Sequence, residues 1–346
     1  MQDVRVYFAT NRNHQPENSK LVFGPRFNAD GVAALRYGHV QFAAGVETLQ
    51  AAEVEVYDDA MGAESDITKG GGRLLEALRR GMCEEGRDTL VFVHGFNVSF
   101  NGAIEAGMRL AREVGVRETD GVVRPVNVVV FSWPSDGAAI PYMSYYSDRE
   151  DARASGPALA RAYLKLRDFL AQLPLEQRCG RRIHLLAHSM GAYVLRHGVQ
   201  AILAKDADGL VRLFDQILLA APDEDDDTFE LDTKLKPLPR IGRQVTVYFN
   251  PSDLALATSD KTKGNPDRLG SDGPRLVDLI PKKVVLVDCR NVARDADMLV
   301  GHSYYSRSAA MAFDIASVLE GVEPERIGNR VYMQSLRAWR IVEERA

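Results

Sequence analysis

Residues 183–192 read Ile183-His184-Leu185-Leu186-Ala187-His188-Ser189-Met190-Gly191-Ala192. The first five residues are mostly large and apolar, which predicts a buried strand. From Gly191 to Ala204 the apolar residues recur every three or four positions, which predicts a helix. A tight turn must join the two elements, and Ser189 lies at its tip. The segment therefore predicts a strand, a sharp turn that carries a serine, and a helix.

The same alternation recurs along much of the chain. Short β-branched runs are each followed by a turn and by helical apolar spacing, which predicts an α/β fold with a mostly parallel central sheet and helices on both faces. The expected strands are Leu90–Val93, Val126–Phe131, Ile183–Ala187, Gln216–Ala220, Val245–Phe249 and Val284–Val287. The expected helices are Arg73–Arg80, Gly102–Val114, Pro157–Leu173, Gly191–Ala204 and Ser306–Leu319.

The N-terminal part departs from this alternation. The runs Val4–Ala9, Gly38–Phe42 and Glu53–Tyr57 are expected strands with little helix between them. They could extend the sheet antiparallel at one edge. We therefore expect a strand-rich extension over residues 1–88, before a catalytic core over residues 89–320.

The C-terminal part carries a helical pattern. Tyr332, Leu336, Trp339 and Val342 are spaced along one helical face. This spacing predicts a helical tail over residues 321–346 that docks on the body of the protein or on a partner subunit. With the core and the extension, it would complete a single domain over residues 1–346.

The composition is that of a globular protein with a sizeable core. Of the 346 residues, 45% are hydrophobic and 26% are charged. Lys and Arg number 43 and Asp and Glu 48, and this net charge of −5 argues against a nucleic-acid partner. No apolar run approaches the roughly 20 residues that span a bilayer, and residues 1–5 do not resemble a secretory signal. The expected compartment is the cytoplasm, and the oligomeric state, monomer or homo-oligomer, stays open.

Metal and cofactor signals are weak. The three cysteines, Cys83, Cys179 and Cys289, are an odd number without metal-ligand spacing, which argues against a disulfide framework and a zinc site. The acidic run Asp223–Asp227 could bind a hard cation, but it could equally begin a helix. We therefore expect no metal and no cofactor.

The turn around Ser189 resembles a nucleophile elbow. The usual pattern is Gly-x-Ser-x-Gly, and here Ala187 replaces the first glycine while Gly191 keeps the second. A serine hydroxyl needs a base, and the usual chain order of serine, acid and histidine leaves His197 and His302. His197 lies two turns into the expected helix, away from the serine. His302, in the loop after the last expected strand, is therefore the predicted base.

The base needs a carboxylate, and the reaction needs donors for an oxyanion. Asp253, after the expected strand Val245–Phe249, is the predicted acid, with Asp223 and Asp288 as alternatives at the ends of neighbouring strands. The strand that ends in His94-Gly95 resembles an oxyanion loop, so the N–H groups of Phe96 and Met190 are the predicted donors. His94 and His188 are interpreted as supporting residues. The expected substrate contacts are Asn97, Tyr142 and Tyr145.

Six short motifs occur together along the chain. They are Phe8-Ala9-Thr10-Asn11-Arg12, Phe131-Ser132-Trp133-Pro134-Ser135, Ala187-His188-Ser189-Met190-Gly191, Ala220-Ala221-Pro222-Asp223, Arg268-Leu269-Gly270 and Gly301-His302-Ser303-Tyr304. Their combination resembles a bacterial α/β-hydrolase subfamily catalogued as a domain of unknown function. The resemblance covers most of residues 1–320. It implies an α/β-hydrolase fold and a serine-hydrolase site of esterase or lipase type, but no particular substrate.

The expected activity is cleavage of a small-molecule carboxylic ester through an acyl-Ser189 intermediate. An amide or thioester hydrolase on the same site is an alternative, and a catalytically silent hydrolase fold that acts as a binding or scaffold protein is another. About 21 residues, 224–244, separate two expected strands, too few for a large cap domain. Specificity is therefore expected from residues 134–156 and 254–283.

Overall fold

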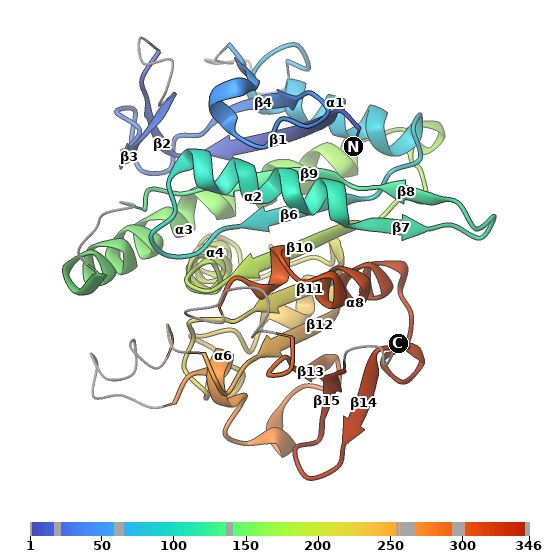
Figure 1. Ribbon diagram of the computed structural model, residues 1–346. Helices are drawn as coiled ribbons and strands as arrows, with labels where there is room; N and C mark the ends of the chain where they lie inside the picture. The colour runs from blue at the N-terminus through green and yellow to red at the C-terminus, as the bar shows by residue number, and fades with distance from the viewer. Residues whose placement is uncertain are drawn as a thin grey trace.

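Eleven strands form one sheet in the order β14-β15-β13-β12-β11-β10-β6-β9-β1-β4-β5 (Figure 1). The computed structural model describes residues 2–16, 22–58, 66–135, 141–253, 256, 267–292 and 302–342, with residues 141–144 and 175 described by their backbone alone. No helix in these ranges is long and apolar enough to cross a membrane.

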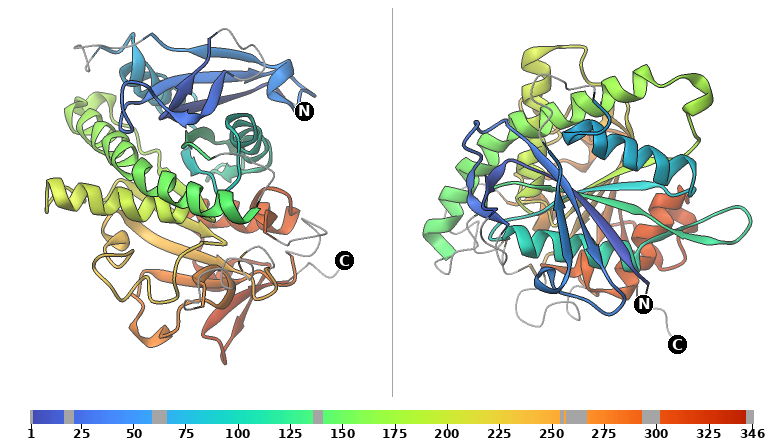
Figure 2. Two further views of the ribbon diagram at one scale, coloured as in Figure 1. Left: turned by 90° about the vertical axis from the view of Figure 1, so that its left-hand side faces the viewer. Right: turned by 90° about the horizontal axis from the view of Figure 1, so that it is seen from above.

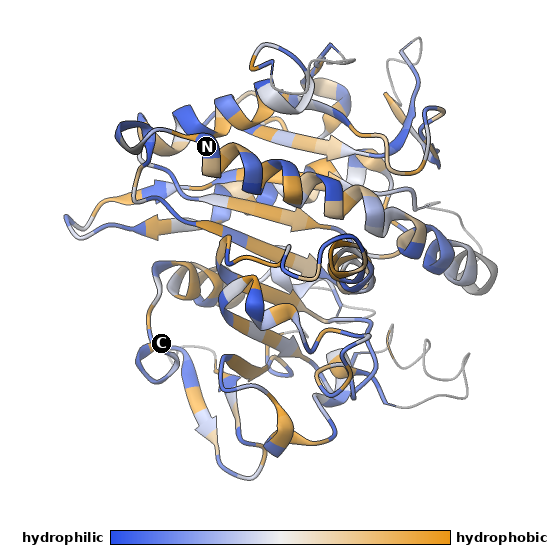
Figure 3. Cartoon of the chain, turned by 180° about the vertical axis from the view of Figure 1, so that it is seen from behind, coloured by the Kyte–Doolittle hydropathy of each residue, from blue (hydrophilic) through white to orange (hydrophobic). Residues whose placement is uncertain are grey.

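The centre of the sheet is parallel, as predicted. Its strands are β6 (Thr89–Val93), β9 (Asn127–Ser132), β10 (Ile183–His188), β11 (Phe214–Ala220), β12 (Gly242–Phe249) and β13 (Val284–Asp288). Each hydrogen-bonds its neighbours in parallel register, and these strands are largely hydrophobic (Figure 3). The predicted strand boundaries differ from these by at most three residues.

Helices cover both faces of this sheet (Figure 2). On one face lie α2 (Phe100–Glu113) and α8 (Ala309–Glu320), and on the other lie α1 (Gly70–Cys83), α3 (Pro141–Gln172) and α4 (Gly191–Lys205). Successive side chains of a strand enter opposite layers: Leu185 belongs to the core under α4, and Leu186 to the core under α2 and α8. Strands buried on both faces explain the continuous apolar runs in the sequence.

Helix α3 is longer than the sequence predicts. Its expected first residue, Pro157, lies inside the helix, which begins at Pro141. A proline is favoured at the start of a helix, which is why the sequence placed the boundary there. The added turns pack on α4, where a Cβ at Gly156 would come within 2.6 Å of His197 Cβ. This tertiary contact outweighs the local signal.

The N-terminal strands extend the sheet. β1 (Val4–Thr10) pairs in parallel with β9, and β4 (Arg36–Phe42) and β5 (Glu53–Val56) follow antiparallel, which confirms the strand-rich extension. Two small hairpins were not predicted. They are β2 (Arg12–His14) with β3 (Phe23–Phe27), and β7 (Gly115–Arg117) with β8 (Val123–Pro125).

The predicted C-terminal helix is wrong. The segment forms a hairpin of β14 (Arg330–Met333) and β15 (Ala338–Ile341), and β15 joins the edge of the sheet beside β13. Tyr332 and Trp339 face each other across this hairpin with ring centroids 5.1 Å apart. Apolar residues of the two strands therefore contact each other across the hairpin. Their spacing of three and four positions, which resembles that of a helix, follows from the short strands and the turn between them.

The remaining elements of the described residues are short. They are α6 (Leu269–Asp272) and the 3-10 helices η1 (Leu49–Ala51), η2 (Leu175–Gln177), η3 (Leu238–Arg240), η4 (Val277–Leu279), η5 (Tyr304–Ser306) and η6 (Pro324–Arg326). Between β11 and β12 the chain contains turns, η3 and one isolated bridge from Asp225 to Arg268, so no large cap is inserted there.

Candidate active site

Ser189 lies between β10 and α4 in a strained turn. Its φ is +52°, a left-handed conformation that residues other than glycine rarely adopt. Its N–H donates to Ala220 O at 2.9 Å, which fixes the turn against β11. A Cβ at Gly191 would come within 2.5 Å of Val93 O, so the second small residue of the motif is a steric requirement. Ala187, at the first small position, is completely buried.

The chain brings Asp253 and His302 together behind this turn. His302 Nδ1 lies 2.7 Å from Asp253 Oδ2, although 49 residues separate them in the sequence. Asp253 follows β12 in a turn closed by its own N–H to Asn250 O, and its other oxygen accepts the N–H of Leu256 at 3.1 Å. A carboxylate at Nδ1 favours the tautomer in which Nε2 is the proton acceptor.

His188 links this pair to the serine. Its Nε2 lies 3.2 Å from His302 O, and the two imidazole centroids are 4.8 Å apart. Burial, and secondarily the charge of His302, hold the pKa of His188 well below its usual value. His188 is therefore neutral, and its Nε2–H donates to the carbonyl. Because His188 adjoins Ser189, this bond fixes His302 beside the elbow.

The two alternative acids contact other groups. Asp223 Oδ2 accepts the hydroxyl of Tyr145 at 2.7 Å, and Arg268 Nε lies 3.4 Å from its Oδ1. Asp288 is buried between Arg290 Nε at 2.8 Å and Arg340 Nη2 at 2.9 Å. These contacts explain why Asp223 and Asp288, like the predicted acid Asp253, are carboxylates at strand ends.

The loop after β6 passes directly over Ser189. A Cβ at Gly95 would come within 2.8 Å of Ser189 Cβ, so only glycine allows this approach. In the described part of the chain, the N–H groups of Phe96 and Met190 have no acceptor. The N–H of Asn97, which has a φ of +56°, instead donates to Asp148 Oδ2 at 3.1 Å. Asn97 thus orders the loop with its main chain.

His94 and Trp133 hold this loop. The rings stack at 5.1 Å with an interplanar angle of 7°. Burial, with a smaller effect of the charge of Arg12, lowers the pKa of His94 to about 3. The neutral ring accepts the N–H of Trp133 at Nε2 (3.1 Å), and its Nδ1–H donates to Gly95 O at 2.9 Å.

Arg12 is a further anchor that the sequence argument did not assign. Its fully buried guanidinium donates to Val98 O at 2.7 Å and to Ser132 Oγ at 2.9 Å. It therefore ties the loop after β6 to the end of β9. The available signal was its place in the motif Phe8–Arg12.

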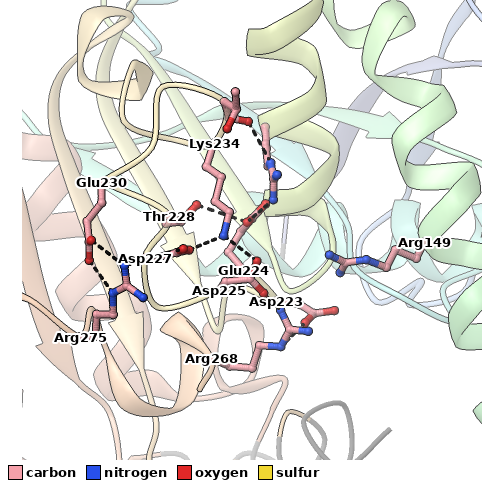
Figure 4. A network of polar contacts seen from close by, with 12 residues as sticks. Arg149, Asp223, Glu224, Asp225, Asp227, Thr228, Glu230, Lys234, Arg268 and Arg275 are labelled. Atoms are coloured by element: carbon pink, nitrogen blue, oxygen red, sulfur yellow. Dashed lines mark hydrogen bonds and ion pairs between the residues drawn. The ribbon is translucent and has the colours of Figure 1, made fainter. Parts of the chain in front are cut away.

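The acidic run Asp223–Asp227 forms ion pairs with the protein's own cations (Figure 4). Asp225 contacts Lys234 Nζ at 2.8 Å and Arg268 Nη1 at 2.6 Å, and Asp227 also contacts Lys234. No helix begins at the run, so that expectation is wrong. Within the described ranges, no three His, Cys, Asp or Glu side chains are grouped to hold a metal.

Burial raises the pKa of Glu224 to about 7, although Arg196 lies 3.3 Å away.

The expected substrate contacts differ in how far they can be placed. Tyr145 is buried, with its ring centroid 5.6 Å from that of Phe96 and its hydroxyl on Asp223. Nearby, Arg149 Cζ lies 3.8 Å from the ring centroid of Tyr193, which is on the first turn of α4. The side chain of Tyr142 lies outside the described residues.

Comparison with family models identifies the family. A family model described as "Alpha/beta hydrolase of unknown function (DUF900)" matches residues 75–321, more than half of the chain. A curated relative, the uncharacterized protein alr1448 of Nostoc sp. (strain PCC 7120), is 27% identical over 131 residues, which cover 33% of this chain and 31% of the relative. The match therefore spans less than a third of the relative's length.

Solved structures show weaker similarity. One, from Lactobacillus plantarum WCFS1, is described as a candidate cell surface hydrolase; it has a TM-score of 0.33 and 15% identity over 70% of this chain and 95% of that one. A lipase-esterase related protein from Clostridium acetobutylicum ATCC 824 has a TM-score of 0.30 and 11% identity over 68% and 94% of the two chains.

Proposed function

The chain belongs to the family described as Alpha/beta hydrolase of unknown function (DUF900), and we propose that it is a serine hydrolase that cleaves carboxylic esters. The observation that carries this proposal is the 2.7 Å contact between His302 and Asp253 beside a serine with positive φ. His302 and Asp253 come from separate segments, and His302 also contacts His188, the residue before Ser189; a fold without chemistry does not require this arrangement. The proposed substrate is a small-molecule ester.

The proposed reaction has two steps. Ser189 Oγ would attack the ester carbonyl as His302 Nε2 takes its proton, and the imidazolium would return that proton to the departing alcohol. The acyl group then stays on Ser189. A water molecule, deprotonated by the same histidine, would attack the acyl carbonyl and release the carboxylic acid and free serine. Asp253 would hold the ring in the required tautomer and stabilise the imidazolium.

The oxyanion of each tetrahedral intermediate needs preorganised donors. The N–H groups of Phe96 and Met190, which lack acceptors in the described part of the chain, are proposed for this role. The stack of His94 on Trp133 and the buried Arg12 support the proposal, because they fix the loop that carries Phe96.

Labelling with a fluorophosphonate probe tests the nucleophile. We expect one covalent adduct on Ser189, located by peptide mass spectrometry, and none in Ser189→Ala. Rates with p-nitrophenyl esters of increasing chain length, with matched thioesters and anilides, then test the bond that is cleaved. Faster thioester or anilide cleavage would replace the ester assignment. If neither an adduct nor turnover is observed, the scaffold alternative is favoured and the proposal is overturned.

A further inference from the structure

A cavity that the elbow residues do not line lies beside the N-terminal ends of β6 and β10. It has a volume of about 590 Å³ and lies between α1, the C-terminal half of α3, α4 and the sheet. Its wall includes Thr89 and Ile183, the first residues of β6 and β10, whereas Ser189 follows the last residue of β10. None of Ser189, Asp253 and His302 lines it.

The interior of this cavity is apolar. Leu74 and Leu78 of α1, Leu166 and Phe169 of α3, and Val199 of α4 are among its walls. Helix α3 packs closely on α4 and much less on α1, and the cavity lies between α1 and α3 beside the sheet. A volume of several hundred Å³ with apolar walls is typical of a site for an organic ligand.

The charged side chains around the cavity are mostly positive. Of the eight that line it among the described residues, seven are Lys or Arg and the eighth is Asp215, although the whole chain carries a net charge of −5. Four of the cations, Arg79, Arg181, Arg182 and Arg243, form ion pairs with carboxylates.

Two cations at the surface end differ from these. Arg178 donates to the carbonyls of Leu173 and Ala171, and neither Arg178 nor Arg212 forms an ion pair among the described residues. Both residues are exposed and line the cavity, so they place positive charge where it meets solvent. An apolar interior with cations at the opening is complementary to a molecule with a hydrocarbon chain and an anionic head.

We propose that this cavity binds a long-chain fatty acid, with the chain between α1 and α3 and the carboxylate at Arg178 and Arg212. This site is separate from the elbow, so the inference does not depend on the proposed function. The driving force would be removal of the alkyl chain from water, and the cations would select acids over neutral amphiphiles of equal length.

Titration calorimetry with fatty acids of 10 to 16 carbons, below their micellar concentrations, tests this. Each added methylene should tighten binding about fourfold until the cavity is full, as expected from burial of one CH₂ group. Ala162 lines the cavity on α3, so Ala162→Trp should abolish binding by filling it. Ala154→Trp, on the same helix but outside the cavity, should bind as the unmodified protein does.

Surface variants test the head group without disturbing the core. Arg178→Gln with Arg212→Gln should weaken the fatty acid at least about tenfold and leave the alcohol of equal length within about twofold. Arg153→Gln, an exposed arginine on α3 outside the cavity, is the matched control. Absence of binding, equal binding by Ala162→Trp and Ala154→Trp, or equal losses for acid and alcohol would each overturn the proposal.

Discussion

Ser189 combines a strained backbone with near-complete burial, and the backbone strain does not depend on its hydroxyl. The elbow is fixed by main-chain bonds and by the glycine contacts at positions 95 and 191. Ser189→Ala should therefore leave the melting temperature almost unchanged. Its kcat with a p-nitrophenyl ester should fall by up to about a millionfold, as when a triad nucleophile is lost. Residual activity above about one per cent would contradict a nucleophilic role.

The choice of acid is also a residue-scale question. Asp253→Asn should place an N–H donor or a weaker acceptor opposite His302 Nδ1, favour the wrong tautomer and reduce kcat on the order of ten thousandfold. Asp223→Asn, whose partners are Tyr145 and Arg268, should reduce kcat much less. Both variants replace an aspartate with asparagine, so their steady-state kcat values show which aspartate is the acid. The reverse order would move the acid to the end of β11.

At the scale of elements, the C-terminal hairpin is attached through a buried ion pair. Arg330 of β14 contacts Asp314 of α8 at 2.6 Å, and both side chains have no exposed surface. Arg330→Ala should lower the free energy of unfolding by about 3–5 kcal/mol, because it leaves a buried carboxylate without its cation. Arg337, in the turn of the same hairpin, forms an exposed ion pair with Asp278 of η4, so Arg337→Ala should cost at most about 1 kcal/mol. Urea unfolding measures both.

The loop after β6 shows how several elements fix one functional segment. Three residues from other elements hydrogen-bond to this segment. Arg12 donates to Val98 O, the N–H of Trp133 donates to His94 Nε2, and Asp148 of α3 accepts the N–H of Asn97. None of these contacts is local in sequence. The spacing of Gly95 from its strand predicts a turn, but the donors and acceptors that order it come from elsewhere in the fold.

At the scale of the whole molecule, buried histidines should make stability depend on pH. Burial, with smaller effects of neighbouring charges, holds the pKa of His94 near 3 and that of His197 near 4, and also keeps the pKa of His188 low. Below about pH 6.5 the unfolded chain binds protons at these positions that the folded chain does not, so stability falls as the pH falls. The midpoint of urea unfolding should therefore decrease from pH 7 to pH 5.

Glu224 should act in the opposite direction. Its pKa is about 7 in the folded chain and near 4.5 in the unfolded chain, so the folded chain holds an extra proton between these values. This group favours folding more as the pH falls. Glu224→Gln should thus steepen the loss of stability between pH 7 and pH 5; an unchanged slope would contradict a raised pKa.

The sequence by itself determined the alternation of strands and helices in the centre of the fold, the parallel centre of the sheet and the serine at a strand-to-helix turn. These follow from the periodicity of apolar residues and from small residues next to Ser189, which are local properties of the chain. The hairpin at residues 330–341 escaped this reasoning, because apolar spacing over a short segment fits a helix and a hairpin alike.

Only the tertiary structure decided which carboxylate meets His302. Asp223, Asp253 and Asp288 all follow strands of one sheet, and the sequence distinguishes them weakly. In the folded chain Asp223 and Asp288 contact arginines, whereas Asp253 Oδ2 lies 2.7 Å from His302 Nδ1. The cavity between α1 and α3 likewise has no sequence signature, because it depends on how closely two helices pack. Contacts between distant residues are set by the packing of whole elements, which no local pattern encodes.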